Sequence, residues 1–303
     1  MELRQLRHFQ EIVRCASFGQ AAQKLNITQP ALSKSIRNLE QSLGCQLFER
    51  HPSGVTTTEH GAVFLDYASL VISELNRAIE ELDSLSGRGR GVVRVGAGST
   101  MMRYLLPQAV RRFMAQAEGN SVSFRQGLKD ELLAMLRRGD IDIMVGSVNP
   151  DTLADDLRHE PVMRDRLVLV ADRAHPLVGA GPVAMAALHE VSWVLPEVSE
   201  PESARLMRAL RRHGMASPHV AVRTGSSVFM AAVLKDSRYL SYLPQGLLSL
   251  DPDYAHLAPV ELAEPIWPLV TVGVVFRRRG VLLAPVRRFI NRLKDVASEL
   301  PEG

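Results

Sequence analysis

The pattern of apolar residues changes abruptly near residue 90, and this change limits the possible folds more than any other feature. Before it, apolar positions recur every three to four residues, as in amphipathic helices; after it, short apolar runs alternate with helical segments. The sequence SGRGRG, residues 86–91, separates the two regions, and its Gly and Arg content favours a hinge. We therefore predict a helical N-terminal region followed by an α/β region.

Composition narrows the class of protein further. The 303 residues suggest two or three domains, and 46% hydrophobic residues supply a core. The net charge of +3 is weak for a protein that binds nucleic acid. Two cysteines cannot build a disulfide framework or a metal site. The charged N-terminus and the lack of a long apolar run predict a soluble, cytoplasmic protein without membrane contact.

Three short helices are expected within the first 45 residues. Ser17 and Thr28 are typical N-cap residues for the second and third, while Asn26 and Gly44 suit their left-handed ends. The buried stripe of the third helix is predicted to comprise Leu32, Ile36, Leu39 and Leu43. Residues 46–58 are typical of two short strands around a His-Pro-Ser-Gly turn.

The opposite face of the third helix carries side chains that can read DNA bases. Gln29, Ser33 and Arg37 recur at every fourth position, flanked by Pro30 and Lys34. Gln pairs with adenine and Arg with guanine in the major groove, so two helices presenting this face predict a helix-turn-helix. An ordinary polar helix surface is the alternative, because such patterns are degenerate.

Charge segregation favours DNA binding. Residues 1–58 contain seven basic and four acidic side chains, a net charge of +3, whereas residues 59–87 contain one basic and six acidic side chains, a net charge of −5. The basic excess therefore lies on the helix-turn-helix, where phosphates would bind.

A long helix is predicted from Thr58 to about Ser86. Its apolar positions follow a period of 3.5 residues, typical of a helix-helix seam, and comprise Phe64, Ala68, Val71, Leu75, Ala78, Leu82 and Leu85. The seam could pack on its own domain or on a second copy. We favour a second copy, because so long a helix would overhang a 58-residue unit.

The N-terminal sequence closely resembles that of LysR-type transcriptional regulators. The matching residues span about sixty positions: Ser17, Phe18, Ala21, Ala22, Leu25, Thr28 to Ser33, Ile36, Leu39, Glu40, Leu43, Gly44, Leu47, Phe48, Arg50, Thr56 to Thr58 and Gly61. The later segments LRRGDIDIMVG and LVLVADRAHPL are also similar to the family, so the resemblance covers the whole chain.

This resemblance implies an α/β protein with four parts. They are a winged helix-turn-helix at 1–58, a dimerisation linker helix at 59–87, a hinge at 88–91 and an effector-binding domain at 92–303. The effector domain would consist of two Rossmann-like subdomains, shaped like a type 2 periplasmic binding protein. Lobe I would comprise 92–162 and 269–303, and lobe II 163–268.

The resemblance also assigns roles to residues of the DNA-binding domain. Gln29, Pro30 and Ser33 are expected to face bases, with Lys34 and Arg37 at base edges or the backbone. Thr28, Arg50 and Thr58 are expected to contact phosphates, with Thr56 nearby on the wing. The expected partner is double-stranded promoter DNA.

The α/β region predicts a ligand site at the ends of its strands. Residues 92–146 follow a βαβαβ pattern, which predicts a parallel sheet; residues 166–243 suggest a second such unit, and a strand at 269–276 and a helix at 285–300 close the chain. Ligand groups are expected at carboxyl ends of strands. These are Ser99, Thr100, Met101, Gln126, Gly127, Ser147 and Val148 in lobe I, and Ser199, Thr224, Ser226 and Pro244 in lobe II.

The hydroxyls and amides at these positions suit a small anion, such as the carboxylates that bind in the resembling family. Ser99, Thr100 and Ser226 could equally be plain N-caps. Gly96 and Gly98 follow a strand as in a dinucleotide fingerprint, but Met101 occupies the third glycine position. With no other catalytic or metal motif, we predict neither enzyme activity, cofactor nor metal.

The predicted function is bacterial transcription regulation, in which an effector moves the lobes and changes the spacing of paired DNA-binding units. The linker seam predicts a dimer, and the resemblance implies a tetramer, with RNA polymerase as a further candidate partner. Two alternatives stay open. One is a ligand-independent repressor or architectural protein with an unused cleft; the other is a solute-binding module, which the charged N-terminus disfavours.

Overall fold

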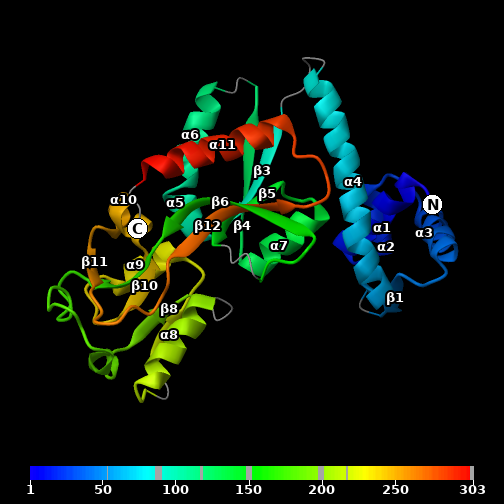
Figure 1. Ribbon diagram of the computed structural model, residues 1–303. Helices are drawn as coiled ribbons and strands as arrows, with labels where there is room; N and C mark the ends of the chain where they lie inside the picture. Colours follow the sequence, from blue (N-terminus) through cyan, green and yellow to red (C-terminus); the bar gives the residue numbers. More distant parts are fainter. Residues whose placement is uncertain are drawn as a thin grey trace. The chain divides into compact units, whose positions relative to one another are not determined.

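The computed structural model describes residues 1–52, 54–85, 91–116, 119–147, 152–196, 201–215 and 218–300 (Figure 1). Contacts divide the chain into two compact units, residues 1–91 with 133–142 and residues 92–132 with 143–303. Residues 88–90 of the expected hinge lie outside the described residues. No described helix is long and apolar enough to cross a membrane.

The first unit begins with three helices and a two-stranded wing. They are α1 (Leu3–Cys15), α2 (Phe18–Lys24), α3 (Gln29–Leu43), β1 (Phe48–His51) and β2 (Gly54–Thr57). The strands pair antiparallel, with Arg50 opposite Val55. Ser17 and Thr28 cap α2 and α3 as predicted, and Asn26 and Gly44 have positive φ angles of 53° and 70°. These local signals therefore place the recognition helix.

The apolar core of this unit lies between α1, α2, α3 and the wing. Phe9 is in ring contact with Phe48 and Phe64, both at 5.1 Å between centroids. Leu32, Ile36 and Leu39 of α3 are buried, as predicted. The prediction was wrong for Leu43, which is 37% exposed. Leu43 is the last residue of α3, and it lies outside the apolar core.

Helix α4 (Glu59–Leu85) is the predicted long helix, and its first turn is fixed to the wing. The Thr58 hydroxyl accepts a hydrogen bond from the Gly61 amide at 2.9 Å and donates one to the Gln46 carbonyl at 2.8 Å. A Cβ atom at Gly61 would lie 2.1 Å from the Leu47 carbonyl oxygen. Only glycine therefore allows α4 to approach Leu47 this closely.

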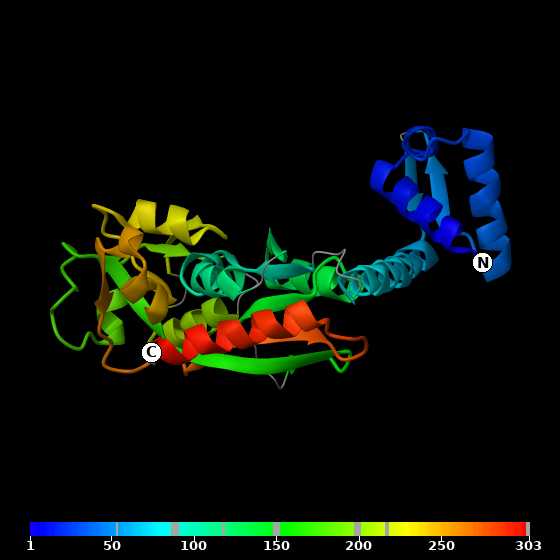
Figure 2. The ribbon, with the colours of Figure 1, turned by 90° about the horizontal axis from the view of Figure 1, so that it is seen from above.

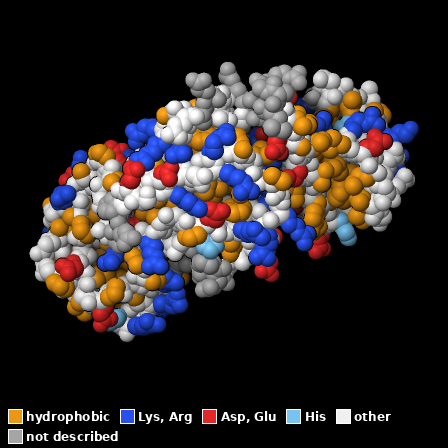
Figure 3. Space-filling view, turned by 45° about the horizontal axis from the view of Figure 1, so that its top comes forward, with side chains coloured by type: hydrophobic (Ala, Val, Ile, Leu, Met, Phe, Trp, Pro, Cys, Tyr) orange, Lys and Arg blue, Asp and Glu red, His pale blue; other side chains and the backbone are white. Residues whose placement is uncertain are grey.

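The predicted seam of α4 needs correction in its first two turns. Ala68 is 1% exposed, and Phe64 packs beside it against the three-helix core. The exposed stripe instead comprises Val63, Tyr67, Val71, Leu75, Ile79 and Leu82, which are 38–67% exposed. Of the predicted seam, Val71, Leu75, Ala78 and Leu82 are exposed, and their role in a seam stays a prediction. The side chain of Leu85 lies outside the described residues. The intramolecular alternative therefore holds at Phe64 and Ala68. Apolar side chains gather over this part of the molecule in the right half of Figure 3.

Residues 133–142 group with the first unit because α4 contacts them. This segment contains the end of α7 (Lys129–Arg138). Ser73 donates a hydrogen bond to the Gly139 carbonyl at 2.8 Å. Arg77, which is 7% exposed, pairs with the buried Asp142 carboxylate and with Glu74.

Lobe I of the second unit is a five-stranded sheet with strand order β4-β3-β5-β12-β6. Its elements are β3 (Val92–Ala97), α5 (Ser99–Arg103), α6 (Leu106–Gln116), β4 (Ser121–Gln126), β5 (Ile143–Ser147), β6 (Leu157–Asp165), β12 (Val270–Arg277) and α11 (Ala284–Glu299). Strand β3 is parallel to β4 and β5, which confirms the βαβαβ prediction. Helices α6 and α11 lie against each other (Figure 2). The rings of Phe113 and Phe289 make an edge contact between them, with centroids 5.4 Å apart.

Lobe II contains two small sheets. Its elements are β7 (Leu167–Asp172), η2 (Met185–Leu188), β8 (Trp193–Leu195), α8 (Pro201–Arg212), β9 (Val220–Arg223), α9 (Ser227–Leu234), β10 (Ser241–Pro244), α10 (Gln245–Leu250), η3 (Pro252–Tyr254) and β11 (Leu257–Val260). Strands β8 and β9 are parallel, as expected. The parallel prediction was wrong for β7, which is antiparallel to β10 and β11. As the central strand, β7 is buried along Leu169–Ala171, and such a run resembles a parallel strand in sequence.

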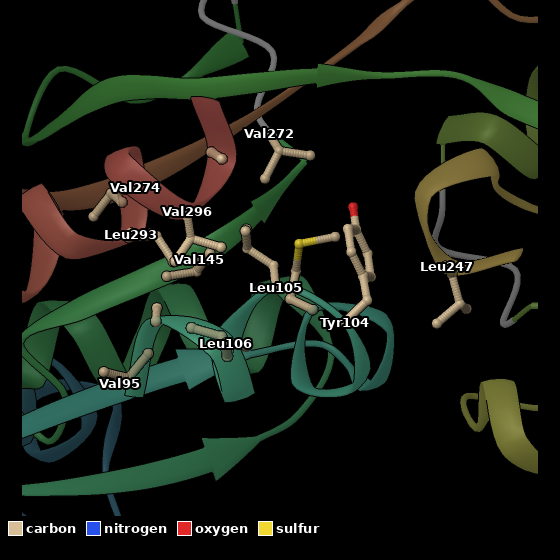
Figure 4. Packing of buried hydrophobic residues seen from close by; sticks show 14 of the residues in the cluster. Val95, Tyr104, Leu105, Leu106, Val145, Leu247, Val272, Val274, Leu293 and Val296 are labelled. Carbon is tan, nitrogen blue, oxygen red and sulfur yellow. The ribbon is translucent and has the colours of Figure 1, made fainter. Parts of the chain in front are cut away.

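One apolar core extends through lobe I into part of lobe II. Val95, Val145, Val274 and Leu293 of lobe I belong to the same cluster as Leu247 of α10 (Figure 4). The chain passes between the lobes at Arg166, between β6 and β7, and returns before Val270. Strand β6 stays in the lobe I sheet as far as Asp165, beyond the expected end of the first lobe I segment at residue 162.

Replacement of glycine by alanine within a helix usually stabilises a protein, but at Gly61 we expect the opposite. Gly61→Ala should destabilise the chain by about 1–3 kcal/mol, because the new methyl group meets a backbone oxygen that cannot move aside. Gly98→Ala is the matched control, since an added Cβ there has no atom within 4 Å. We expect it to change stability by less than about 0.5 kcal/mol. Urea unfolding followed by circular dichroism measures both, and equal stability of the two variants would contradict this packing.

Candidate DNA-binding and effector-binding sites

The exposed face of α3 brings most of the predicted base-reading residues together. Gln29, Pro30, Lys34 and Arg37 are exposed and Ser33 is half-buried. Within the described part of the chain, Lys34 and Arg37 have no ion pair. The Thr28 hydroxyl accepts a hydrogen bond from the Ala31 amide at 3.4 Å, which leaves its hydrogen able to donate to a phosphate. This face can therefore present donors to base edges and to the DNA backbone.

A buried histidine behind α3, which the sequence did not suggest, links it to α1. The Nδ1 atom of His8 lies 2.8 Å from the Ser35 hydroxyl. Burial, and secondly the guanidinium of Arg4, lower the pKa of His8 below its ordinary value. The neutral imidazole therefore supports the recognition helix from its inner side. No sequence signal marks His8, because its partner is 27 residues away.

The wing presents Arg50 and Thr56 in different surroundings. The guanidinium of Arg50 lies 4.5 Å above the centroid of the Phe18 ring, a cation–π contact that orients this exposed side chain. The Thr56 hydroxyl is 3.1 Å from Nε2 of His51. Arg50 is thus held at the surface with donors available for a phosphate.

Thr58 already uses its hydroxyl within the protein. Its hydrogen bonds to Gln46 and Gly61 fix the junction between the wing and α4. A phosphate contact by this hydroxyl would have to replace the bond to Gln46. The phosphate role of Thr58 therefore stays a prediction that competes with a structural role.

In lobe I, the predicted effector residues lie at one edge of the sheet. Ala97 of β3 is paired with Gln126 of β4 and with Val145 of β5, so the residues after these parallel strands lie at the same edge. Thr100 is half-buried, and Gln126 and Ser147 are exposed. Met101 is different: it is 6% exposed and belongs to the apolar core. Val148 lies outside the described residues.

Residues of lobe II contact this edge of the lobe I sheet by bonding to Ser99. The Ser99 hydroxyl donates to the Gly225 carbonyl at 3.1 Å and accepts from the Ser227 amide at 3.5 Å. Thr224 and Ser226 accept hydrogen bonds from backbone amides of their own turn, and Ser226 caps α9. Pro244 ends β10, while Ser199 lies outside the described residues. The strand ends of both lobes therefore meet at Ser99. Ser226 has the plain N-cap role that the sequence left open as an alternative to ligand binding.

Two polar contacts beside α5 were not predicted, and the first of them joins the lobes. Arg103 of α5 forms a bidentate ion pair with Asp251, at 2.7 and 3.0 Å, and a further pair with Asp253. The hydrogen bond to Asp251, followed by that to Asp253, raises the pKa of Arg103. The Tyr104 hydroxyl donates to the buried Asp165 carboxylate at 2.7 Å, and burial raises the pKa of Tyr104. The ion pairs of Arg103 hold α5 against lobe II, whereas the Tyr104 hydrogen bond stays within lobe I, at the end of β6.

These parts define a class of protein: a DNA-binding regulator whose helix-turn-helix is attached to a two-lobed α/β domain. The comparisons with known proteins agree with this class. Residues 3–62 match the family model of bacterial regulatory helix-turn-helix proteins of the lysR family, and residues 86–298 match the LysR substrate binding domain. The chain therefore belongs to the LysR family of transcriptional regulators.

Relatives and solved structures extend over the whole chain. This chain is 28% identical over 305 residues to the transcriptional regulator PcaQ of Agrobacterium fabrum, and the match covers 100% of this chain and 97% of PcaQ. It is 30% identical over 281 residues to the uncharacterized regulator YdcI of Escherichia coli, covering 91% of each. The fold is similar to that of full-length CbnR complexed with its target DNA, with a TM-score of 0.68 and 22% identity over 98% of this chain and 100% of CbnR.

The geometry of α3 and the wing predicts different effects for two substitutions. Gln29→Ala should reduce discrimination at one base pair by about 1–3 kcal/mol, because a base contact is lost. Arg50→Ala should weaken binding to all duplexes alike and lower the salt slope of log K by about 0.9.

Selection from a randomised duplex library, followed by affinity measurements over a salt series, separates the two effects. Gln41→Ala is the matched control, because Gln41 is an exposed glutamine near the other end of α3. Unchanged selectivity in the Gln29 variant would rule out its base contact.

Proposed function

We propose that this LysR-family regulator responds to a small anionic metabolite, with a carboxylate as the favoured class, bound at the strand ends of its two lobes. The observation that carries the proposal is the meeting of lobe I and lobe II at Ser99, whose hydroxyl bonds to the carbonyl of Gly225 and the amide of Ser227. The hydroxyls of Thr224 and Ser226 belong to the same turn of lobe II. Such groups are donors to an anion, and the same place joins the lobes, so an occupant would bias their relative position. The family's DNA binding supports a site of action in the cytoplasm.

Thr100 is the best residue for testing the ligand site. It is half-buried in α5, next to Ser99. In a thermal-shift screen of small carboxylates, a ligand at about 100 times its Kd should stabilise the chain by about 2.7 kcal/mol, a shift of several degrees. Thr100→Ala should weaken that shift, whereas Ser121→Ala, at the opposite end of β4, should leave it unchanged. A ligand that binds both variants equally would place the site elsewhere.

A ligand-independent repressor or architectural protein is the second candidate function. The Arg103–Asp251 ion pair and the shared apolar core favour it, because both resist movement between the lobes. Two results together would support this candidate over effector control. Transcription from the target promoter would be the same with and without each carboxylate, and the thermal-shift screen would show no change in melting temperature.

We further propose that two copies associate through the exposed stripe of α4 defined above. Six apolar side chains in six turns exceed what a lone helix exposes without a partner. Paired linker helices would place two recognition helices on one operator, as two-fold DNA-binding proteins require. Assembly of dimers into a tetramer and contact with RNA polymerase follow from the resemblance and stay predictions.

Adjacent residues of α4 provide a matched test of this association. Leu75→Glu places a charge in the stripe and should convert the assembly to monomers at micromolar concentration, because a buried unpaired charge is costly. Asn76→Glu adds the same charge at a neighbouring exposed position and should leave the assembly unchanged or much less affected. Sedimentation velocity measures both, and an unchanged oligomer in the Leu75 variant would argue against this interface.

A further inference from the structure

Helix α8 of lobe II has a basic surface on one side. Its arginines are Arg205, Arg208, Arg211 and Arg212, and its only acidic residue is Glu202 in the first turn. The buried residues Ser203, Leu206 and Leu210 form the opposite face. At 100° per residue, Arg205, Arg208 and Arg212 lie directly opposite this buried face and extend over about 10 Å of helix.

The arginines of α8 have little to neutralise them. Arg208, Arg211 and Arg212 are exposed and Arg205 is half-buried. Among the described residues, no carboxylate forms an ion pair with any of the four. Arg211 and Arg212 stabilise the negative end of the helix dipole, which explains their position. That effect does not extend to Arg205 and Arg208, which lie in the middle of the helix.

The helix that carries this face is firmly anchored. The indole nitrogen of Trp267 donates to the Glu202 carbonyl at 3.0 Å, and the Ser203 and Tyr242 hydroxyls are 2.7 Å apart in the buried interior. Leu206 and Leu210 are completely buried. The arginines therefore lie on a helix that is fixed to the interior of lobe II, and Figure 1 shows this helix, α8, at the outer side of that lobe.

The surroundings favour a polyanion over a folded protein as the occupant. Protein interfaces usually place aromatic, Met or Leu side chains at their centre. None of the large hydrophobic residues that are exposed in the described chain belongs to α8, and the nearest in sequence is Val228. Guanidinium groups bind phosphate oxygens bidentately, and DNA is already held by this protein at high effective concentration.

We propose that the outer face of α8, with Arg205, Arg208 and Arg212, binds the DNA phosphate backbone without sequence preference. This contact rests on the DNA binding of the family and adds a second DNA surface, on the effector domain. Because phosphate contacts release counterions, three such contacts would add about 2–3 to the salt slope of log K. Longer duplexes would then bind more tightly than short ones, independently of their sequence.

The test compares full-length variants on a labelled mixed-sequence duplex of about 100 bp over a salt series. Replacing Arg205, Arg208 and Arg212 by Gln should lower the salt slope by about 2–3. Between 50 and 200 mM salt, wild-type affinity should then fall about 40-fold more than that of the variant. Replacement of the same three residues by Lys should restore most of the slope, because the positive charge remains.

A second triple variant controls for the loss of charge alone. Arg111, Arg279 and Arg288 are exposed arginines of lobe I with no ion pair among the described residues. Their replacement by Gln should leave the slope as in wild type. Circular dichroism and thermal unfolding verify that each variant folds.

Four outcomes would overturn the proposal. A wild-type slope in the α8 variant would show that α8 does not contact DNA. Equal losses in both triple variants would show only a general charge effect. If the wild-type protein binds RNA polymerase in a pull-down and the α8 variant does not, while both bind DNA with equal affinity, the partner of the α8 face is an acidic protein. If the wild-type protein binds no duplex at all, DNA binding by this chain is rejected as a whole. This result differs from the other three outcomes, in which the wild-type protein still binds DNA.

Discussion

The buried ion pair between Arg77 and Asp142 is the interaction on which the first unit most depends. Both side chains are less than 10% exposed, and Arg77 also donates to the Ile141 carbonyl. A buried pair is costly to break, because the remaining charge loses its partner; such losses are about 3–5 kcal/mol. Separation of α4 from residues 133–142 would therefore leave a buried charge without its partner.

The position of Asp142 in the chain gives this ion pair a functional meaning. Asp142 immediately precedes β5, and Ser147, a predicted effector residue, ends that strand. Strand β5 thus begins directly after the anchor of the linker helix and ends at a predicted ligand residue. The same helix begins at the wing, where Thr58 and Gly61 hold it against Leu47. Helix α4 is therefore held near its start by the contact with Leu47 and farther along by the pair between Arg77 and Asp142.

Local signals in the sequence predicted most of the fold, because they act within a few residues. The caps Thr28 and Ser17, the left-handed Asn26 and Gly44, and the long helix all lie where they were expected. Strand β6 was missed because it is an edge strand in which charged residues such as Arg158 and Glu160 alternate with apolar ones. Arg103 and Asp251 are 148 residues apart, and no spacing rule connects them. Phe64 and Ala68 likewise pack in the core and not in the predicted seam, because α4 lies against the three-helix core at these positions.

The small net charge of the chain results from surfaces of opposite sign. Residues 1–58 and helix α8 each carry +3, while residues 59–87 carry −5. An acidic linker repels phosphates, so DNA is favoured only at surfaces with a local basic excess. The DNA-binding domain has only part of this excess on α3, where Lys34 and Arg37 stand against Glu40, whereas α8 concentrates its excess on one helix face. A total near zero therefore keeps indiscriminate attraction to nucleic acid weak, and leaves DNA affinity to the few places where arginines and lysines are unpaired.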